Sequence, residues 1–513
     1  MKERDEIKVG SVLSYIQIAL NVIVGFLYTP IMIRYLGKSE YGLYNTVASV
    51  ISIISLISLG FNSGYIKYYS IYKEKDDKDS ISKLNGLYLI IFIIIGIVSL
   101  LCGLFLTFNL GLVFGDGLTA NEYGIAKWLM LLLTINLAVS FPMSVFSNII
   151  TAHEKFVFLK LLAIFRTLLS PLITLPLLLI GFKSIAMVVV TVSVNLFIDI
   201  LYLFFVLCRL KCKFVFHGFE KGLFGSIFKY TIFVAIHLIV DQINTNLDKF
   251  ILGRFKGTDA VAVYSVGASL YSYYITVGLA FVSFFAPRVH RIVTEEADRV
   301  CLKNRLTELF VKVGRIQYIV VSLVASGYVF FGKQFISYWA GSGYDDAYYV
   351  GLCLIIPGFI DLIQNIGIEI QRAQNKHMFR AVVYICMAVV NIIVSVILCQ
   401  YLGAIGCAIG TGISLILVQG VIINIYYQKK CNLDIKKFWL SILRMSIALV
   451  PPVALGTIIT IFVNINSLIM LILMILLYAC VFGVSMWILG LNKYEKGLFV
   501  GMIRKIYRKG SKG

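Results

Sequence analysis

The stretch Leu84–Phe108 reads LNGLYLIIFIIIGIVSLLCGLFLTF and contains no charged side chain. About 20 apolar residues in a helix are enough to cross the hydrocarbon core of a bilayer, which is about 30 Å thick. A surface helix of a soluble protein would need a charged face, and this stretch has none. Because comparable runs recur to the end of the chain, the stretch predicts a polytopic membrane protein and excludes a secretory signal peptide as its explanation.

The composition of the 513 residues agrees with a membrane location. Only 14% of the residues are charged, whereas soluble domains average about 25%, and the mean hydropathy is +0.90. A water-soluble protein of this length would need a charged surface that the chain lacks. We therefore expect an all-α fold, because chains that cross a bilayer in runs this long satisfy their backbone hydrogen bonds as helices.

Fourteen apolar runs are long enough to span the membrane as helices. Their approximate limits are 11–33, 42–66, 84–108, 124–150, 157–180, 185–207, 223–253, 260–287, 306–331, 347–371, 378–401, 404–427, 438–462 and 467–490. The even number of spans predicts that both termini lie on the same side of the membrane.

The connectors between these runs set the orientation. The net charge is +20, and most of the 46 Lys and Arg residues fall in alternate connectors. Those connectors are 1–10, 67–83, 152–160, 208–222, 287–305, 372–380, 428–437 and 492–513. Since cytoplasmic loops carry an excess of Lys and Arg, we expect a cytoplasmic-membrane protein with both termini in the cytoplasm. This distribution explains the basic charge better than nucleic-acid binding does.

Two segments resemble each other closely enough to predict an internal repeat. IMIRYLGKSEYGLYNTVASV begins at Ile31, and ILGRFKGTDAVAVYSVGASL begins at Ile251. The identical pairs in this alignment are Ile31, Arg34, Gly37, Tyr44, Ala48 and Ser49 with Ile251, Arg254, Gly257, Tyr264, Ala268 and Ser269. A second match joins AHEKFVF, from Ala152, to AQNKHMF, from Ala373.

The repeat predicts three parts of the chain. Residues 1–210 form an N-lobe of helices one to six, and 217–428 form a C-lobe of helices seven to twelve. Residues 429–513 add helices thirteen and fourteen and a basic cytoplasmic tail. Transporters built from such repeats bind substrate between them and alternate access by moving one repeat against the other.

The segment Thr29–Asn45, TPIMIRYLGKSEYGLYN, resembles the opening of polysaccharide-export flippases of the Wzx type. These belong to the multidrug/oligosaccharidyl-lipid/polysaccharide (MOP) exporter superfamily. Their pattern is an apolar helix with a proline near its end, then Leu-Gly, then Tyr-Gly-Leu-Tyr. The matching residues here are Pro30, Leu36, Gly37, Tyr41, Gly42, Leu43 and Tyr44. The resemblance continues through the helix layout and covers nearly the whole chain.

This resemblance implies a V-shaped fold of two lobes around a central cavity. It implies a flippase for undecaprenyl-diphosphate-linked oligosaccharide repeat units, destined for O-antigen, capsule or exopolysaccharide. It further implies coupling to a gradient of H⁺ or Na⁺ and contact with the polysaccharide polymerase machinery. A flippase for lipid II or a teichoic-type precursor, or a cation-coupled drug antiporter of the same superfamily, stays open as an alternative.

Charged residues inside apolar runs are the strongest site candidates, because each costs about 2.5–3.5 kcal/mol to insert. Run 223–253 holds a polar stripe with two carboxylates, formed by His237, Asp241, Asn244 and Asp248, whose spacing places all four on one helical face. Such a stripe suits ion coupling or substrate contact, although it would equally bond a neighbouring helix. In run 347–371, Asp361 and Asn365 are four residues apart and form a second polar stripe.

Basic and aromatic side chains are candidates for the diphosphate and sugar pathway. Arg166 can hold a diphosphate through its planar guanidinium, or pair with Asp199. Lys67 can receive the diphosphate or serve as an ordinary boundary charge. The repeat-related Arg34 and Arg254 lie near the predicted outer face and are candidates for the outward gate or for release of the diphosphate. The last candidate is Tyr264, whose ring suits a sugar.

The sequence contains no signature of an enzyme. It has no nucleophile elbow, no phosphate-binding loop and no cluster of metal ligands, and its scattered cysteines form no zinc-like pattern. We therefore expect a transporter without a cofactor, with a membrane glycosyltransferase or polymerase as the less favoured reading.

Overall fold

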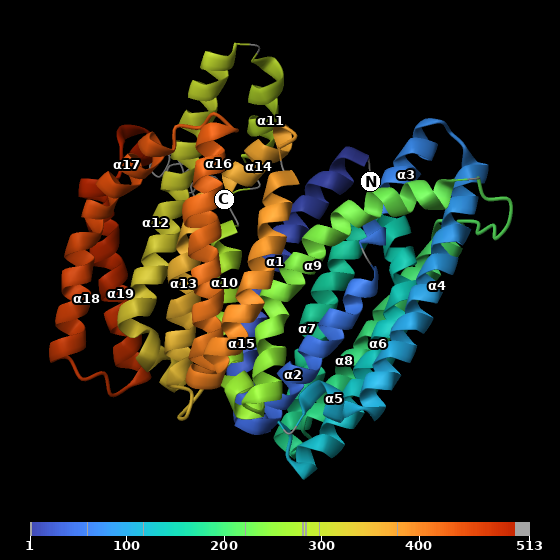
Figure 1. Ribbon diagram of the computed structural model, residues 1–513, viewed down its shortest axis with the longest axis horizontal. Coiled ribbons are helices and arrows are strands. Elements are labelled where there is room, and N and C mark those ends of the chain that lie inside the picture. Colours follow the sequence, from blue (N-terminus) through green and yellow to red (C-terminus); the bar gives the residue numbers. More distant parts are fainter. Residues whose placement is uncertain are drawn as a thin grey trace, which may run out of the picture. The chain divides into compact units, whose positions relative to one another are not determined.

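The computed structural model describes residues 3–58, 60–115, 117–220, 222–279, 282, 285–296, 298–376 and 378–497. These residues form helices and connecting turns, and none of them lies in a strand. The chain divides into two compact units (Figure 1). Unit 1 contains Met1–Ser265 and Ile392–Cys407, and unit 2 contains Val266–Asn391 and Ala408–Gly513. The predicted basic tail falls largely on 498–513, outside the described residues.

Unit 1 is built from the helices of the first half of the chain. They are α1 (Glu3–Leu36), α2 (Lys38–Ile54), η1 (Ser55–Ser58), α3 (Phe61–Glu74), α4 (Lys78–Phe108), α5 (Leu110–Phe114), α6 (Ala120–Ala152), α7 (Phe156–Ile180), α8 (Ser184–Phe204), η2 (Phe205–Arg209) and α9 (Leu223–Phe255). In Figure 1, α4 lies along α6, and α6 packs in turn on α8. The helix α10 (Thr258–Leu279) begins in unit 1 and continues into unit 2.

Unit 2 contains the helices of the second half. They are α11 (Ala286–Glu295), α12 (Arg299–Trp339), α13 (Asp346–Ile363), α14 (Ile366–Ala373), α15 (Met378–Leu415), η4 (Ile416–Ile422), α16 (Ile423–Lys429), α17 (Ile435–Ser446), η5 (Ile447–Leu449), α18 (Val450–Phe462), α19 (Leu468–Ser485) and η6 (Met486–Gly490). The residues 392–407 of α15 belong to unit 1.

The helix α4 confirms the prediction made from Leu84–Phe108. Asp77 caps the start of α4 by accepting the backbone N–H of Ser80 at 2.9 Å. This hydrogen bond stabilises the carboxylate and lowers the pKa of Asp77. One face buries Tyr88 and Phe92 in the core of unit 1, whereas the opposite face exposes Leu101 by 61%. Exposed aliphatic side chains on a run without charges are what a lipid-facing helix requires.

The predicted number of fourteen spans is not confirmed. Among the described residues, twelve helices are long and apolar enough to cross a membrane. One of the twelve, Met378–Lys429, covers two predicted spans in 52 residues. A single helix of that length would measure about 78 Å, more than twice the hydrocarbon thickness. Its backbone leaves the helical conformation at Gly403 (φ 57°), between those two spans. The helix α9, which covers predicted span 223–253, is not among the twelve.

The turns of the backbone follow the register of the predicted repeat. Gly37, between α1 and α2, has φ 79°, and Gly257, between α9 and α10, has φ 78°. Glycine is suited to both positions because left-handed backbone is costly for other residues. The N-caps of α4 and α12 also correspond, since Asp77 and Asp298 each accept backbone N–H groups from their own first turn.

The second repeat match shows the same agreement in finer detail. Glu154 and Asn375 are both left-handed, with φ values of 60° and 55°, which is uncommon outside glycine. The next backbone N–H then reaches back to the preceding helix, from Lys155 to the Ile150 carbonyl and from Lys376 to the Gln371 carbonyl. These matches support the repeat itself; the lobe limits 1–210 and 217–428 stay a prediction.

A buried ion pair joins the segment after α19 to α12. Arg315 is 9% exposed and Glu495 is 1% exposed. The Arg315 guanidinium donates to Glu495 Oε1 at 2.6 Å and to Oε2 at 2.8 Å, and it also donates to the Gly490 carbonyl at 2.8 Å. The pair therefore connects α12 with the segment after α19, the helix that covers the predicted span 467–490.

Candidate functional site

The polar stripe of α9 ends at a buried carboxylate. Asp248 is 2% exposed, and the Tyr264 hydroxyl in α10 donates to its Oδ2 at 2.6 Å. The side chains of His237, Asp241 and Asn244 lie outside the described residues. Within unit 1, Tyr264 is itself buried, and its hydroxyl has a structural partner in Asp248. Its role at a sugar stays a prediction.

Substitution of Tyr264 by phenylalanine should destabilise the protein modestly. The variant removes one hydrogen bond to a buried carboxylate, which we expect to lower the free energy of unfolding by about 1 kcal/mol. The measurement is the unfolding midpoint of purified protein in detergent. Tyr44→Phe is the matched control, because Tyr44 occupies the same repeat position and its hydroxyl contacts no carboxylate among the described residues. Equal midpoints for the two variants would contradict the Asp248 assignment.

The two arginines related by the repeat differ in their surroundings. Arg254, in the last turn of α9, donates from Nη1 to the carbonyls of Leu112 and Val113 at the end of α5. It therefore supplies donors to a helix C-terminus that would otherwise be unsatisfied. Arg34 is exposed in the last turn of α1. Their predicted role in release of a diphosphate stays a prediction.

A carboxylate that was not predicted organises the same end of unit 1. Glu122, at the start of α6, accepts the hydroxyls of Ser39 (2.5 Å), Thr258 (2.6 Å) and Thr119 (2.7 Å). The α1–α2 turn, the α6 start and the α9–α10 turn are thereby held together. A methyl group at Gly42 would lie 1.9 Å from the Thr258 carbonyl, so glycine is required for this close approach.

The other two basic candidates of unit 1 are exposed. Lys67 in α3 places its Nζ 4.0 Å from the ring centroid of Tyr230 in α9, a cation–π contact that leaves the ammonium accessible. Arg166 in α7 interacts electrostatically with Asp199 in α8, but these two described residues form no ion pair within 4.0 Å. Both readings of Arg166, the diphosphate contact and the structural partner of Asp199, stay predictions.

In unit 2, Asp361 is part of a polar cluster centred on an arginine. The Arg380 guanidinium, near the start of α15, lies 3.3 Å from Asp361 Oδ1 at the end of α13. It donates to the hydroxyls of Tyr384 and, at 3.3 Å, Tyr427. Arg380 is 8% exposed, and the Gln419 amide donates to the same Tyr384 hydroxyl. We call these five residues the Arg380 cluster.

The backbone beside the Arg380 cluster is broken. The predicted span 347–371 is two helices, α13 and α14, separated by a turn at Gln364 and Asn365. The Gln364 side chain donates at 2.8 Å to Asn424, whose amide donates to the Gln419 and Gly420 carbonyls of the π-helix η4. Interrupted helices and π-turns are frequent at functional sites, because they expose backbone and polar side chains inside a helical bundle.

Comparison with known proteins identifies the family of the chain. Residues 8–292 match the family model described as polysaccharide biosynthesis protein, which is more than half of the sequence. The chain belongs to the polysaccharide biosynthesis protein family. This confirms the MOP superfamily that Thr29–Asn45 resembles.

Solved structures of MOP proteins share the fold of this polysaccharide biosynthesis protein. The lipid II flippase MurJ, in an inward closed conformation, matches with a TM-score of 0.71 over 93% of this chain and 97% of that chain, at 16% identity. An inward-facing multidrug resistance MATE transporter matches with a TM-score of 0.66 over 81% and 94%, at 13% identity. No curated protein sequence matches the chain. At these identities the likeness shows the fold alone, and with it a multi-pass membrane protein.

The polysaccharide biosynthesis protein thus carries an arginine site that sequence reasoning missed. Arg380 falls in connector 372–380, where the positive-inside rule already accounts for its charge. The available signal was its place as the third residue of α15, inside the apolar run 378–401. A buried guanidinium flanked by two phenols can bind phosphate oxygens by charge-assisted hydrogen bonds and offer aromatic faces to sugars.

Proposed function

We propose that the protein flips undecaprenyl-diphosphate-linked oligosaccharide repeat units across the cytoplasmic membrane, from which surface polysaccharide is assembled. The observation that carries this proposal is the family match over residues 8–292. Polysaccharide synthesis needs lipid-linked sugars to cross a membrane, and a bundle of membrane helices suits that step. The protein acts in this proposal as a transporter, not as an enzyme, and hands its cargo to the polymerase machinery.

The Arg380 cluster supports the proposal on chemical grounds. A diphosphate carries negative charge that has to be compensated inside the protein, and Arg380 provides a guanidinium that is 8% exposed. Tyr384 and Tyr427 add aromatic rings and hydroxyls beside that cation. Asp361 balances the charge of Arg380 when no cargo is bound, which lowers the cost of keeping a cation at this depth.

Ion coupling is the second part of the proposal. A carboxylate held inside a helix bundle can exchange its hydrogen-bond partner for H⁺ or Na⁺, and Asp248 is such a carboxylate in α9. We assign the polar stripe of α9 to coupling and the Arg380 cluster to cargo. This division places ion and cargo sites on different helices.

Deletion of the gene tests the function directly. We expect complete lipid-linked repeat units to accumulate on the inner leaflet and surface polysaccharide to disappear, as measured by lipid extraction and glycan staining. The wild-type gene should reverse both effects. Intact surface glycan without accumulated intermediate would reject the proposal.

A precursor flippase for peptidoglycan is the second candidate, favoured by the shared fold of the lipid II flippase. The same extraction separates the two, because that function predicts accumulation of lipid II and loss of viability instead. If the protein is a drug antiporter, neither lipid should accumulate in the deletion strain, and that strain should be more sensitive to cationic drugs.

A further inference from the structure

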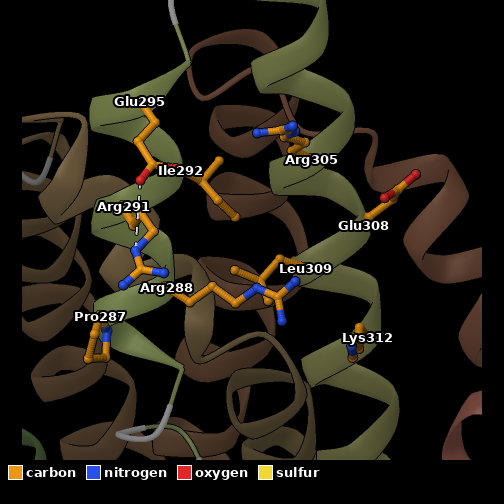
Figure 2. A pocket seen from close by; sticks show the side chains of 9 residues that line it. All are labelled: Pro287, Arg288, Arg291, Ile292, Glu295, Arg305, Glu308, Leu309 and Lys312. Carbon is orange, nitrogen blue, oxygen red and sulfur yellow. Dashed lines mark ion pairs between the residues drawn. The ribbon is translucent and has the colours of Figure 1, made fainter.

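A charged groove of about 730 Å³ lies between α11 and α12 in unit 2 (Figure 2). Four cations and two carboxylates line it: Arg288, Arg291, Arg305, Lys312, Glu295 and Glu308. Arg288 and Arg305 reach from the two helices into the space between them. The lining also contains two apolar side chains, Ile292 from α11 and Leu309 from α12. We call this space the α11–α12 groove.

The internal repeat shows that the fold does not need these charges. The charged groove positions of α12 correspond to three buried aliphatic positions of α4, 221 residues earlier in the chain. They are Arg305, Glu308 and Lys312 in α12, and Leu84, Leu87 and Ile91 in α4. In unit 1, α3 and α4 pack around a hydrophobic core. In unit 2, the corresponding helices α11 and α12 leave a groove that is lined with cations.

The cations of the groove are available to a ligand. Arg288 forms no ion pair within 4.0 Å with any described residue, and Arg291 lies 3.9 Å from Glu295 on an exposed helix face. Arg305 pairs with Glu296 at 3.1 Å. The Lys312 Nζ lies 3.5 Å from the Tyr494 ring centroid, a contact that leaves its three donors in place. Among the described residues, Arg288 therefore faces the groove without a carboxylate within 4.0 Å, and Lys312 keeps its ammonium donors beside it.

The length of α12 places the groove at the surface of the bilayer. The helix has 41 residues, which corresponds to about 62 Å, about twice the thickness of the hydrocarbon core. Its first fourteen residues, RVCLKNRLTELFVK, hold all the groove charges of α12, and an uncharged stretch, 316–332, begins directly after Arg315. The groove thus opens where α12 leaves the apolar layer, at the depth of lipid head groups.

We infer that the α11–α12 groove binds the phosphodiester head group of an anionic membrane phospholipid. Guanidinium forks match phosphate oxygens, and a basic site at this depth is exposed to the negative surface of the membrane. The volume is adequate for a head group with its glycerol, since ligand pockets measure about 300–1,000 Å³. The site is independent of the cargo and would hold for any lipid-linked substrate.

Native mass spectrometry of the full-length protein in detergent tests this site. We expect phosphatidylglycerol to be retained and phosphatidylcholine of the same chain length to be lost. The double variant Arg288→Gln/Arg305→Gln should weaken phosphatidylglycerol binding about thirtyfold. Glu295→Gln removes a carboxylate and releases Arg291, so it should strengthen binding about fivefold.

The matched control is Lys437→Gln/Arg444→Gln, which removes two exposed cations from α17 and should bind as the wild type does. Equal retention of the two lipids by the wild type, or unchanged binding in both groove variants, would overturn the inference. Displacement of phosphatidylglycerol by inorganic pyrophosphate would also overturn it and assign the groove to a diphosphate instead.

Discussion

A protein that carries glutamine in place of Arg380 should reach the membrane at normal abundance and export no detectable surface glycan. Glutamine keeps a hydrogen-bonding side chain but removes the charge and the fork that contact Asp361, Tyr384 and Tyr427. A charge-assisted contact with a diphosphate contributes about 3 kcal/mol, so the transport rate should fall about a hundredfold. The measurement is glycan restored to the deletion strain by each variant.

A second substitution separates transport from packing. If Arg380 only neutralises Asp361, then Asp361→Asn/Arg380→Gln should restore export, because neither charge is left unbalanced. If Arg380 contacts cargo, the double variant should stay inactive at normal abundance. The matched control is Glu369→Gln/Arg372→Gln, which removes an exposed pair of 2.7 Å in α14 and should leave export unchanged. Restored export in the Arg380 double variant would withdraw this cluster from the mechanism.

Replacement of Arg315 by methionine is expected to cause the largest loss of stability. Glu495 would remain buried without the two nitrogens that it accepts from, at 2.6 Å and 2.8 Å. Removal of one member of a buried ion pair costs about 3–5 kcal/mol, since the other charge stays desolvated. The measurement is the free energy of unfolding in detergent, with the yield of folded protein as a second readout.

The reverse substitution and the double variant check the cause. Glu495→Gln should be about as destabilising as Arg315→Met, because it leaves the guanidinium unbalanced. Arg315→Met/Glu495→Met should recover most of the loss, as apolar pairs of similar volume do in buried sites. A double variant as unstable as the sum of the two single variants would show that the charges act independently.

The fold was predictable where a run is wholly apolar. The helix α4 follows from Leu84–Phe108 because hydropathy is a local property of the chain. The number of spans was not predictable, because tertiary packing decides where a helix stops inside an apolar run. The span 347–371 is broken at Gln364 and Asn365, whose polar side chains find partners only in distant helices. The break at Gly403, in contrast, falls between the predicted spans 378–401 and 404–427.

The candidate site was predictable only in part. A carboxylate in an apolar run is unusual enough to single out Asp361 and Asp248. Their partners, Arg380 and Tyr264, were harder to identify, because a boundary arginine and a membrane tyrosine both have ordinary explanations. Arg254 was singled out as a candidate for the outward gate, and no sequence pattern indicated that its guanidinium also donates to the helix carbonyls of Leu112 and Val113. Which side chain is structural depends on contacts between helices, and no local pattern carries that information.

The Arg315–Glu495 pair also constrains the order in which the protein is made. Its two members are 180 residues apart in the chain. At about 5–20 residues per second, the ribosome needs about 9–36 s to reach Glu495 after it has passed Arg315. For that time the nascent α12 holds an uncompensated cation, which the insertion machinery or water has to shield. Unit 2 can therefore form this pair only after Glu495 has been synthesised, and a stop codon between Gly490 and Glu495 would leave Arg315 without its carboxylate.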